Sequence, residues 1–382
     1  MAAAARQVSR AAGKQGSGGI APVRAIGAGT PAEWDAASLA ADHGWLFQLD
    51  EAARADLLAA VKRSYDPARS LFSYTREEFN LGRAEPQIRA AVRETFDGRG
   101  ISLLRGMPRE GLSEQEFEFL TWGIGLHLGV ARPQSKASQY ISQVRNIGTD
   151  YRSPTGRGYS SNAELDFHTD GADLIVLTCY NQAKSGGMSM CSSSLTAHNI
   201  LLHEAPALLE LLYGAFHYSR QAEQAPGEAP HFTCPIYGVA EDRLFGRWVR
   251  NRVEQAQKLP GVPQLNARQR EALDLLDAVV RRPALMYPFF LQPGDMQLLH
   301  NHTTLHSRTE FEDHAEPEKR RLLYRLWLAP PNSRRLPPGW VEPYKSCEPG
   351  AVRGGIRGQN WNAEKQGYES RQAAALGMTW AA

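Results

Sequence analysis

Residues 167–180 read FHTDGADLIVLTCY, and this stretch decides the fold class. Its second part, Asp173 to Tyr180, is a nearly continuous apolar run, which is typical of a strand buried on both faces. Its first part places His168 and Asp170 two positions apart, and in extended backbone residues i and i+2 point to the same side. We therefore expect a buried strand with two candidate metal ligands at its entrance.

A second histidine cluster lies far downstream, in residues 300–306 (HNHTTLH). Two histidines and one carboxylate on one face of a metal leave cis positions open, and iron(II) oxygenases use these to bind a chelating cosubstrate and oxygen. The same ligands also suit zinc. The His-x-Asp triplet alone is weakly specific, because a loop histidine hydrogen-bonded to a turn aspartate gives the same pattern. The buried strand that follows favours the metal site, since it places the triplet at the mouth of a core.

Residues 320–328 (RRLLYRLWL) carry two arginines on what we expect to be a buried strand. Arg321, Leu323, Arg325 and Trp327 share one face, and the other face is wholly apolar. An unpaired buried charge is very costly, so both guanidinium groups need anionic partners. Those partners are either acidic residues of the chain or carboxylates of bound small molecules, which guanidinium binds through two parallel hydrogen bonds.

Hydrophobic periodicity and turn signals predict the remaining elements. The expected helices are residues 50–64, 113–125, 196–216 and 266–282, two of which begin with a capping box. The expected strands are residues 100–106, 173–180, 188–194, 284–291, 296–299 and 321–329, with a hairpin of residues 231–237 and 243–249. Strands that return after a long helical excursion indicate one interrupted β-structure. We expect a mainly β fold with flanking helices, either a sandwich or a barrel.

Composition narrows the class of protein. The chain has 382 residues, is 42 % hydrophobic and carries a net charge of +2, which predicts a globular protein without nucleic-acid or membrane partners. No apolar run of about 18 residues predicts a transmembrane helix. The four cysteines form no C-x-x-C pair, and so few cysteines suit a reducing compartment, here the cytoplasm.

Residues 1–30 are rich in alanine, glycine and serine, and they contain basic but no acidic residues. We expect a disordered tail there and one domain over residues 31–382. The same acid-free composition overlaps that of organelle transit peptides, so targeting to an organelle is the alternative location.

Several stretches, taken together and in order, resemble the taurine dioxygenase / 2,4-dichlorophenoxyacetate dioxygenase (TauD/TfdA-like) family. The resemblance runs from about Ala163 to Pro330. It is carried by residues 162–171, 183–189, 293–296, 301–309 and 320–325. It implies a double-stranded β-helix (jelly roll) of the clavaminate synthase-like type.

The resemblance implies that His168, Asp170 and His306 hold iron. His306, and neither other histidine of its cluster, matches the family's distal ligand because it lies five residues after Asn301 and just before Ser307. With an aspartate at position 170, halogenation is disfavoured, since related halogenases carry a small residue there.

Four further residues are assigned by the same resemblance. Arg321 matches the arginine that binds the far carboxylate of 2-oxoglutarate, and Ser189 matches a hydroxyl residue that supports this carboxylate. Arg325 matches an arginine that meets an acidic substrate in some members, and Asn162 is a second substrate-binding candidate. The spacer between His306 and Arg321 is longer here than in taurine dioxygenase.

The function implied is that of a non-haem iron(II)- and 2-oxoglutarate-dependent dioxygenase. Such an enzyme uses O2, releases succinate and CO2, and hydroxylates or otherwise oxidises a small substrate, here expected to be a carboxylic or amino acid-like compound. One alternative is a zinc-dependent hydrolase, which would leave Arg321 unexplained. Another is a non-catalytic jelly-roll binding protein, although all three ligands are intact. A homo-oligomer is compatible with the sequence.

Overall fold

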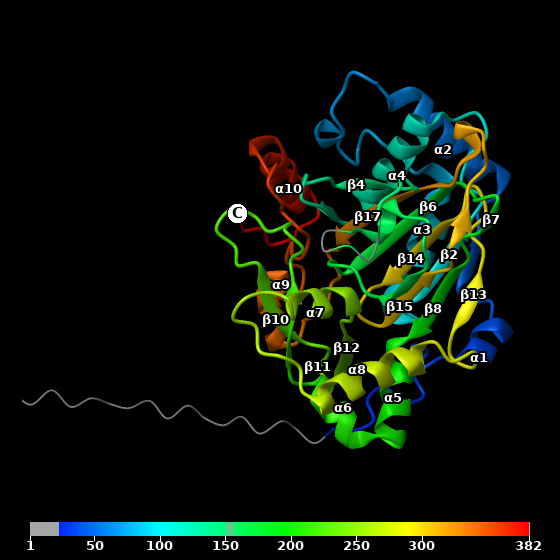
Figure 1. The fold of residues 1–382 in the computed structure, drawn as a ribbon. Helices are drawn as coiled ribbons and strands as arrows, with labels where there is room; N and C mark the ends of the chain where they lie inside the picture. Colours follow the sequence, from blue (N-terminus) through cyan, green and yellow to red (C-terminus); the bar gives the residue numbers. More distant parts are fainter. Residues whose placement is uncertain (1–22, 151–152, 154–155, 382) are drawn as a thin grey trace, which may run out of the picture.

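The computed structural model describes residues 23–150, 153 and 156–381. Two β-sheets pack against each other, and helices cover their outer sides (Figure 1). The larger sheet has the order β1-β2-β14-β6-β17-β3, and β4 also pairs with β17. Its strands are β1 (Leu46–Gln48), β2 (Ile101–Arg105), β3 (Val130–Arg132), β4 (Ile141–Val144), β6 (Leu174–Asn181), β14 (Met296–His300) and β17 (Leu322–Ala329). The smaller sheet has the order β13-β8-β15-β5, built from β5 (Leu165–His168), β8 (Ser189–Ser193), β13 (Tyr287–Phe289) and β15 (Thr304–Arg308).

The predicted central strands are confirmed as buried. Every residue of β17 is buried, and its side chains alternate between two cores. Leu326 and its even-numbered neighbours on β17 face the helices, whereas Leu323 and Trp327 face the smaller sheet. Arg325 lies two residues from each of them and therefore shares their face, so its side chain is directed into the space between the sheets.

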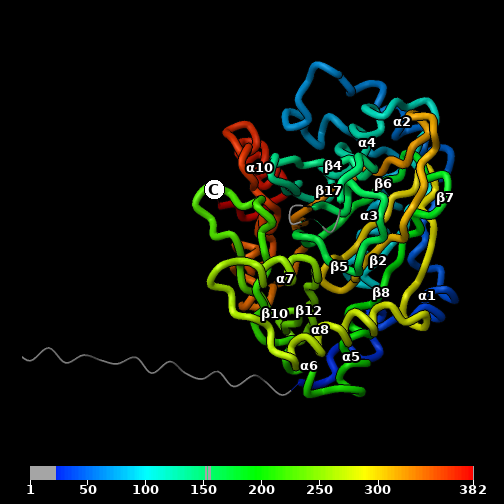
Figure 2. The backbone as a smooth tube through the Cα atoms, viewed as in Figure 1, coloured from blue at the N-terminus to red at the C-terminus, as the bar shows by residue number. Residues whose placement is uncertain are grey.

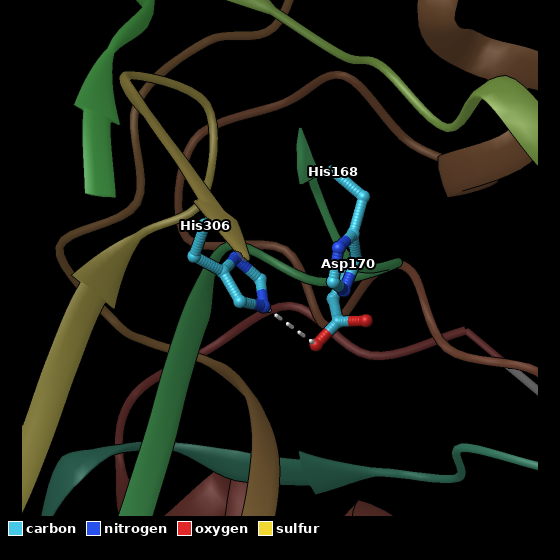
Figure 3. Close-up of side chains that lie close together, drawn as sticks. All are labelled: His168, Asp170 and His306. Carbon is cyan, nitrogen blue, oxygen red and sulfur yellow. Dashed lines mark ion pairs between the residues drawn. The ribbon is translucent and has the colours of Figure 1, made fainter. Parts of the chain in front are cut away.

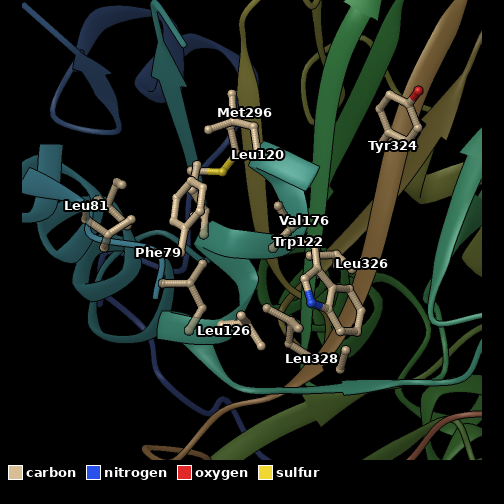
Figure 4. Packing of buried hydrophobic residues seen from close by; sticks show 14 of the residues in the cluster. Phe79, Leu81, Leu120, Trp122, Leu126, Val176, Met296, Tyr324, Leu326 and Leu328 are labelled. Carbon is tan, nitrogen blue, oxygen red and sulfur yellow. The ribbon is translucent and has the colours of Figure 1, made fainter. Parts of the chain in front are cut away.

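Four helices cover the outer face of the larger sheet: α2 (Glu51–Ser64), α3 (Glu85–Asp97), α4 (Glu114–Leu128) and α10 (Ala363–Ala375). Figure 4 shows Leu120 and Trp122 of α4 in the same core as Leu326 and Leu328 of β17. Gly125 permits this close packing, because a Cβ atom there would lie 2.5 Å from Leu326 Cδ1. The core that results holds β17, and with it the two arginines, in a fixed position.

The excursion between β8 and β13 differs from the prediction in two places. It contains α5 (Ser194–Glu204), α6 (Pro206–Leu212), β9 (Ala215–Ser219), β10 (His231–Pro235), β11 (Tyr237–Ala240), β12 (Arg243–Gly246), α7 (Arg250–Ala256) and α8 (Ala267–Val280). The single helix predicted for residues 196–216 is wrong, because Pro206 lacks the N–H that would continue α5 and begins a second helix. The predicted hairpin of residues 231–237 and 243–249 is also wrong, since β10 pairs with β9 and β11 with β12.

Both ends of the described chain pack onto this framework. Residues 1–22 of the predicted tail lie outside the described residues. Ile26 is only 5 % exposed and belongs to the core that includes α5, so packed structure begins before the predicted boundary at residue 31. At the other end α10, red in Figure 2, lies beside β3, where Glu369 forms an ion pair with Arg132 at 2.6 Å. Every helix in the described part of the chain is too short or too polar to cross a membrane.

Candidate active site

Three predicted ligands converge at one end of the smaller sheet. His168 ends β5 and pairs in register with His306 on β15, and the centroids of the two imidazole rings are 4.3 Å apart. Asp170 lies two residues beyond β5, with its Oδ2 atom 3.9 Å from His306 Nε2 (Figure 3). One ligand atom from each residue lies within 4.8 Å of the others, and no other trio of His, Cys, Asp or Glu in the described part does so.

The loop that carries Asp170 is held in place by the side chain of Asn301, the residue that directly follows β14. The amide of Asn301 accepts a hydrogen bond from the main-chain N–H of Asp170 at 2.8 Å and donates to the carbonyls of Asp170 and Ala172, both at 2.7 Å. On the other side, the N–H of Thr169 donates to the carbonyl of Trp248 at 2.8 Å. The sequence motif included Asn301 but did not reveal this role, which depends on contacts across about 130 residues of chain.

The protonation states of the trio suit a divalent cation. His168 Nδ1 lies 2.8 Å from the carbonyl of Asp166, which can only accept, so this nitrogen is the donor and Nε2 is the nitrogen left for a metal ion. Burial lowers the pKa of His306 to about 3, so its imidazole is neutral near pH 7. Burial raises the pKa of Asp170, but Arg325 and the two histidines outweigh this and hold it at about 2. Two neutral imidazoles and one carboxylate are the ligand forms that iron(II) or zinc requires.

Arg325 has an acidic partner within the chain. Its Nη1 atom lies 3.2 Å from Asp170 Oδ2, and its Nε donates to Gln134 Oε1 at 2.8 Å. Trp327 also donates to Asp170, at 3.0 Å. Sequence analysis missed both supporting side chains, although Trp327 shares the face of Arg325 on the predicted strand. The internal-pairing interpretation therefore holds for Arg325, whose Nη2 alone is buried without a hydrogen-bond partner.

Arg321, in contrast, forms no ion pair with any described residue. Its Nη1 atom is buried and has no hydrogen-bond partner. Burial lowers the pKa of this guanidinium to about 10, so it remains charged at neutral pH. Arg321 and Ser189 line the same cavity of about 610 Å³ as the three candidate metal ligands. This cavity therefore combines three candidate metal ligands with a cation that has no counter-ion among the described residues.

The structure does not bring every predicted residue to the cavity. Asn162 is exposed and outside the lining, and its side-chain amide donates to the carbonyl of Phe311 at 3.2 Å. His302 is buried elsewhere, with Nε2 3.1 Å from Asp173 Oδ1. Asp173 is also bound by Arg353 at 2.6 Å, so this second carboxylate–histidine pair is neutralised within the fold. Of the downstream cluster, His306 alone reaches the candidate metal site.

Comparison with known proteins places these features in a family. The model of the family "Taurine catabolism dioxygenase TauD, TfdA family" matches residues 65–327. FR-33289 synthase of Streptomyces rubellomurinus is 32 % identical over 308 residues, which cover 80 % of this chain and 91 % of that protein. The taurine hydroxylase-like protein SAT17 of Stachybotrys chartarum is 25 % identical over 320 residues, which cover 80 % of this chain and 81 % of that protein.

Solved structures share the fold at low sequence identity. An asparagine oxygenase in complex with Fe(II), 3-hydroxyasparagine and succinate superposes with a TM-score of 0.59 at 17 % identity, over 74 % of this chain and 93 % of that one. The non-haem iron oxygenase OrfP in complex with Fe and alpha-ketoglutaric acid superposes with a TM-score of 0.53 at 16 % identity. The match covers 74 % of this chain and 94 % of that one. The expected jelly-roll fold is confirmed by these likenesses. The chain belongs to the TauD/TfdA family and is an iron(II)- and 2-oxoglutarate-dependent dioxygenase.

Proposed function

We propose that His168, Asp170 and His306 hold the iron and that Arg321 binds the far carboxylate of 2-oxoglutarate, with the Ser189 hydroxyl beside it. One observation carries this assignment. The same cavity is lined by three side chains placed to bind a metal ion and by a buried arginine that has no counter-ion among the described residues. A guanidinium that lacks an acidic partner inside the fold is stabilised when a ligand carboxylate arrives. The zinc-hydrolase alternative leaves Arg321 unexplained, and the non-catalytic alternative leaves the intact set of three candidate ligands unexplained.

Iron and 2-oxoglutarate, when bound, supply the oxidising chemistry in which O2 is consumed, 2-oxoglutarate becomes succinate and CO2, and a C–H bond of the substrate is oxidised. The chain's own contribution is orientation and exclusion of water. Asn301 fixes the main chain on both sides of the Asp170 side chain. Arg325 and Trp327 orient the carboxylate itself, which leaves it ionised and directed at the cation.

The prime substrate is a small acid, in this proposal a carboxylic or amino acid-like compound. The cavity lining contains eleven arginine or lysine side chains and three acidic ones, which favours an anionic ligand. The asparagine oxygenase and OrfP structures contain hydroxylated amino acids, which supports the same class. Arg325 Nη2 is available to such a ligand, whereas the exposed Asn162 is left out of the proposed site.

The test is succinate formation from 2-oxoglutarate with iron(II), ascorbate and air, stimulated by members of a panel of carboxylic and amino acids. Stimulation by at least one acid, with an oxidised product of matching yield, is the expected result. Absence of any succinate with iron-loaded protein would contradict the proposal.

Three further expectations accompany this function. A reducing compartment such as the cytoplasm suits the chain, because all four cysteines are free thiols. The balanced net charge of +2 argues against nucleic-acid and membrane partners. A single domain that contains residues 31–382 and the packed Ile26 before them, with or without assembly into a homo-oligomer, completes the proposal.

Replacing Asn301 with alanine is expected to weaken metal binding by about 10–100-fold, the usual effect of losing a group that orients a ligand. It removes three hydrogen bonds to the Asp170 loop and leaves a buried N–H unsatisfied, which costs about 1–3 kcal/mol of stability. Cobalt(II) titration of the folded protein measures the affinity. Asn199→Ala is the matched control, since that amide binds Glu33 far from the trio. An unchanged cobalt(II) affinity in N301A would show that the Asp170 loop keeps its conformation without the hydrogen bonds of Asn301.

His306→Ala is expected to lose metal binding, whereas His302→Ala and His314→Ala retain it. His302 is committed to Asp173, which keeps Arg353 as a partner when the imidazole is removed. H302A therefore loses stability, because a fully buried ring is deleted, but not the metal site. Metal stoichiometry of the purified folded variants distinguishes the three. A stoichiometric loss in H302A would place the distal ligand elsewhere.

A further inference from the structure

Arg247 lies on a segment that is bonded directly to the metal loop. Its neighbour Trp248 exchanges hydrogen bonds with Thr169, and Val249 forms an antiparallel bridge with His168. The Trp248 indole points away from the cavity, and its N–H donates a hydrogen bond to the Asp277 carboxylate at 2.7 Å. Side chains alternate in direction along extended chain, so those of Arg247 and Val249 point opposite to that of Trp248, and both line the cavity.

The guanidinium of Arg247 is buried among aromatic rings, and no carboxylate of the described residues forms an ion pair with it. The side chain is 5 % exposed, and its Cζ atom lies 4.6 Å from the ring centroid of Tyr218 and 4.9 Å from that of Phe232. The Nε and Nη1 atoms are buried without hydrogen-bond partners. The ionisable groups that would favour its charge are Cys234, Tyr344 and Tyr218. Burial raises the pKa of each of them, that of Cys234 to about 12, so all three are neutral at pH 7.

The other buried arginines of the cavity, apart from Arg321, are bound by carboxylates or, as with Arg308, by main-chain carbonyls, here that of Ser161 at 3.0 Å. Arg325 has Asp170, and Arg252 has Glu223 at 2.9 Å. Pairs of the same kind are Arg132 with Glu369 and Arg353 with Asp173. Arg321 is accounted for by 2-oxoglutarate in the proposed function. Arg247 thus needs an anion that no described residue supplies.

A second unpartnered donor lies beside it. The Tyr344 hydroxyl is buried, has no hydrogen-bond partner, and belongs to the lining of the same cavity. Tyr344 comes from α9 (Val341–Tyr344), which follows the stretch matched by the family model. The hydroxyl lies close enough to the Arg247 guanidinium to favour its charge. Two donor groups from distant segments thus meet at the cavity, where they form a site for one oxyanion.

We propose that Arg247, with the Tyr344 hydroxyl, binds an oxyanion group of the prime substrate and so determines substrate specificity. This inference rests on the proposed function, because it makes the oxyanion one end of the molecule whose other end is oxidised. Two residues of a strand span roughly 7 Å and paired strands lie roughly 5 Å apart, so a small acid reaches from Arg247 to the metal loop. The substrate class is a small organic acid whose acidic group, planar carboxylate or tetrahedral oxyanion, is remote from the carbon that reacts.

The experiment titrates sodium sulfate and sodium acetate into the full-length protein loaded with manganese(II) and 2-oxoglutarate, with thermal unfolding as the readout. At least one of the two anions is expected to stabilise the wild type, and the stronger one identifies the oxyanion geometry. Arg247→Met is expected to raise the dissociation constant of that anion at least about tenfold, and Arg247→Lys to raise it less, since it keeps the charge but not the fork. Arg109→Met is the matched control, because Arg109 lies 3.9 Å from the ring centroid of Tyr180 and donates to the carbonyl of that residue outside the cavity lining. Its anion affinity should stay within about twofold of the wild type.

Unfolding without added anion gives a second readout. R247M should be at least as stable as the wild type there, because an apolar side chain replaces an uncompensated buried charge. A purely structural arginine would instead leave R247M less stable and its anion response unchanged, and that result would overturn the inference. So would an absence of stabilisation by either anion.

The same titration separates this inference from the proposed function. In an Arg321→Met variant without metal or 2-oxoglutarate, the anion response assigned to Arg247 should persist, and adding R247M should remove it. Persistence of the response in the double variant would overturn the inference while leaving the iron and 2-oxoglutarate assignments untouched. Failure of succinate formation with an intact anion response would instead count against the proposed function alone.

Discussion

His168→Ala and Asp170→Ala are expected to abolish succinate formation and to lower metal affinity by far more than the 10–100-fold that follows loss of an orienting residue. Each removes one of only three protein ligands, so the ion would be held by two side chains and water. Metal content after dialysis and succinate yield measure the effect. His231→Ala is a matched control, because it deletes another half-buried strand histidine that lies outside the cavity lining.

The two variants should differ in stability, which adds a second signature. His168 is half-buried, and among the described residues its imidazole hydrogen-bonds to the carbonyl of Asp166 alone, so H168A should fold with a modest loss of stability. D170A leaves Arg325 as a buried cation without a partner, a situation that costs about 3–5 kcal/mol. Equal urea midpoints for the two variants would show that the Arg325 contact contributes little. Full turnover in H168A would contradict the ligand assignment itself.

Local patterns were enough to predict β17, which carries Arg325, but the strands of the two histidines, β5 and β15, were not among the expected strands. The alternation of β17 between two cores follows from residues 322–328 alone, because a period of two is visible in any strand buried on both faces. The i, i+2 spacing of His168 and Asp170 likewise predicted their convergence. The choice of His306 over His302 required the family resemblance, since the residues of the cluster by themselves fit either histidine.

Partners distant in sequence could not be predicted in this way. Arg325 and Asp170 are separated by 155 residues, and no local feature says that one neutralises the other. The strand β9 was missed because its residues continue the apolar stripe of the helices before it, and its hairpin with β10 was lost with it. Arg247 gave no signal either, because an arginine within a predicted hairpin strand is normally solvated and its burial depends on Tyr218 and Phe232 from the hairpin of β9 and β10.

Arg321→Ala is expected to raise the 2-oxoglutarate concentration for half-maximal rate by about a hundred-fold or more. Removing one partner of a buried charge pair costs about 3–5 kcal/mol, and each 1.4 kcal/mol is about tenfold in affinity. The neighbouring cations are already engaged, Arg325 by Asp170 and Arg308 by the carbonyls of Ser161 and Ala163, so neither replaces the lost cation without breaking those contacts. Arg321→Lys should recover only part of the affinity, since an ammonium group cannot reproduce the two parallel hydrogen bonds of the guanidinium.

Steady-state turnover with 2-oxoglutarate and the prime substrate varied in turn separates this effect from a general loss of structure. Arg321→Ala should change the 2-oxoglutarate dependence and leave that of the substrate nearly unaltered, whereas Arg325→Ala should weaken the substrate and release succinate without matching product. Arg109→Ala is the control, because that arginine donates to the carbonyl of Tyr180 outside the cavity lining. An unchanged 2-oxoglutarate dependence in R321A would mean that its charge is structural, and the cosubstrate carboxylate would then have to be bound by another cation of the cavity.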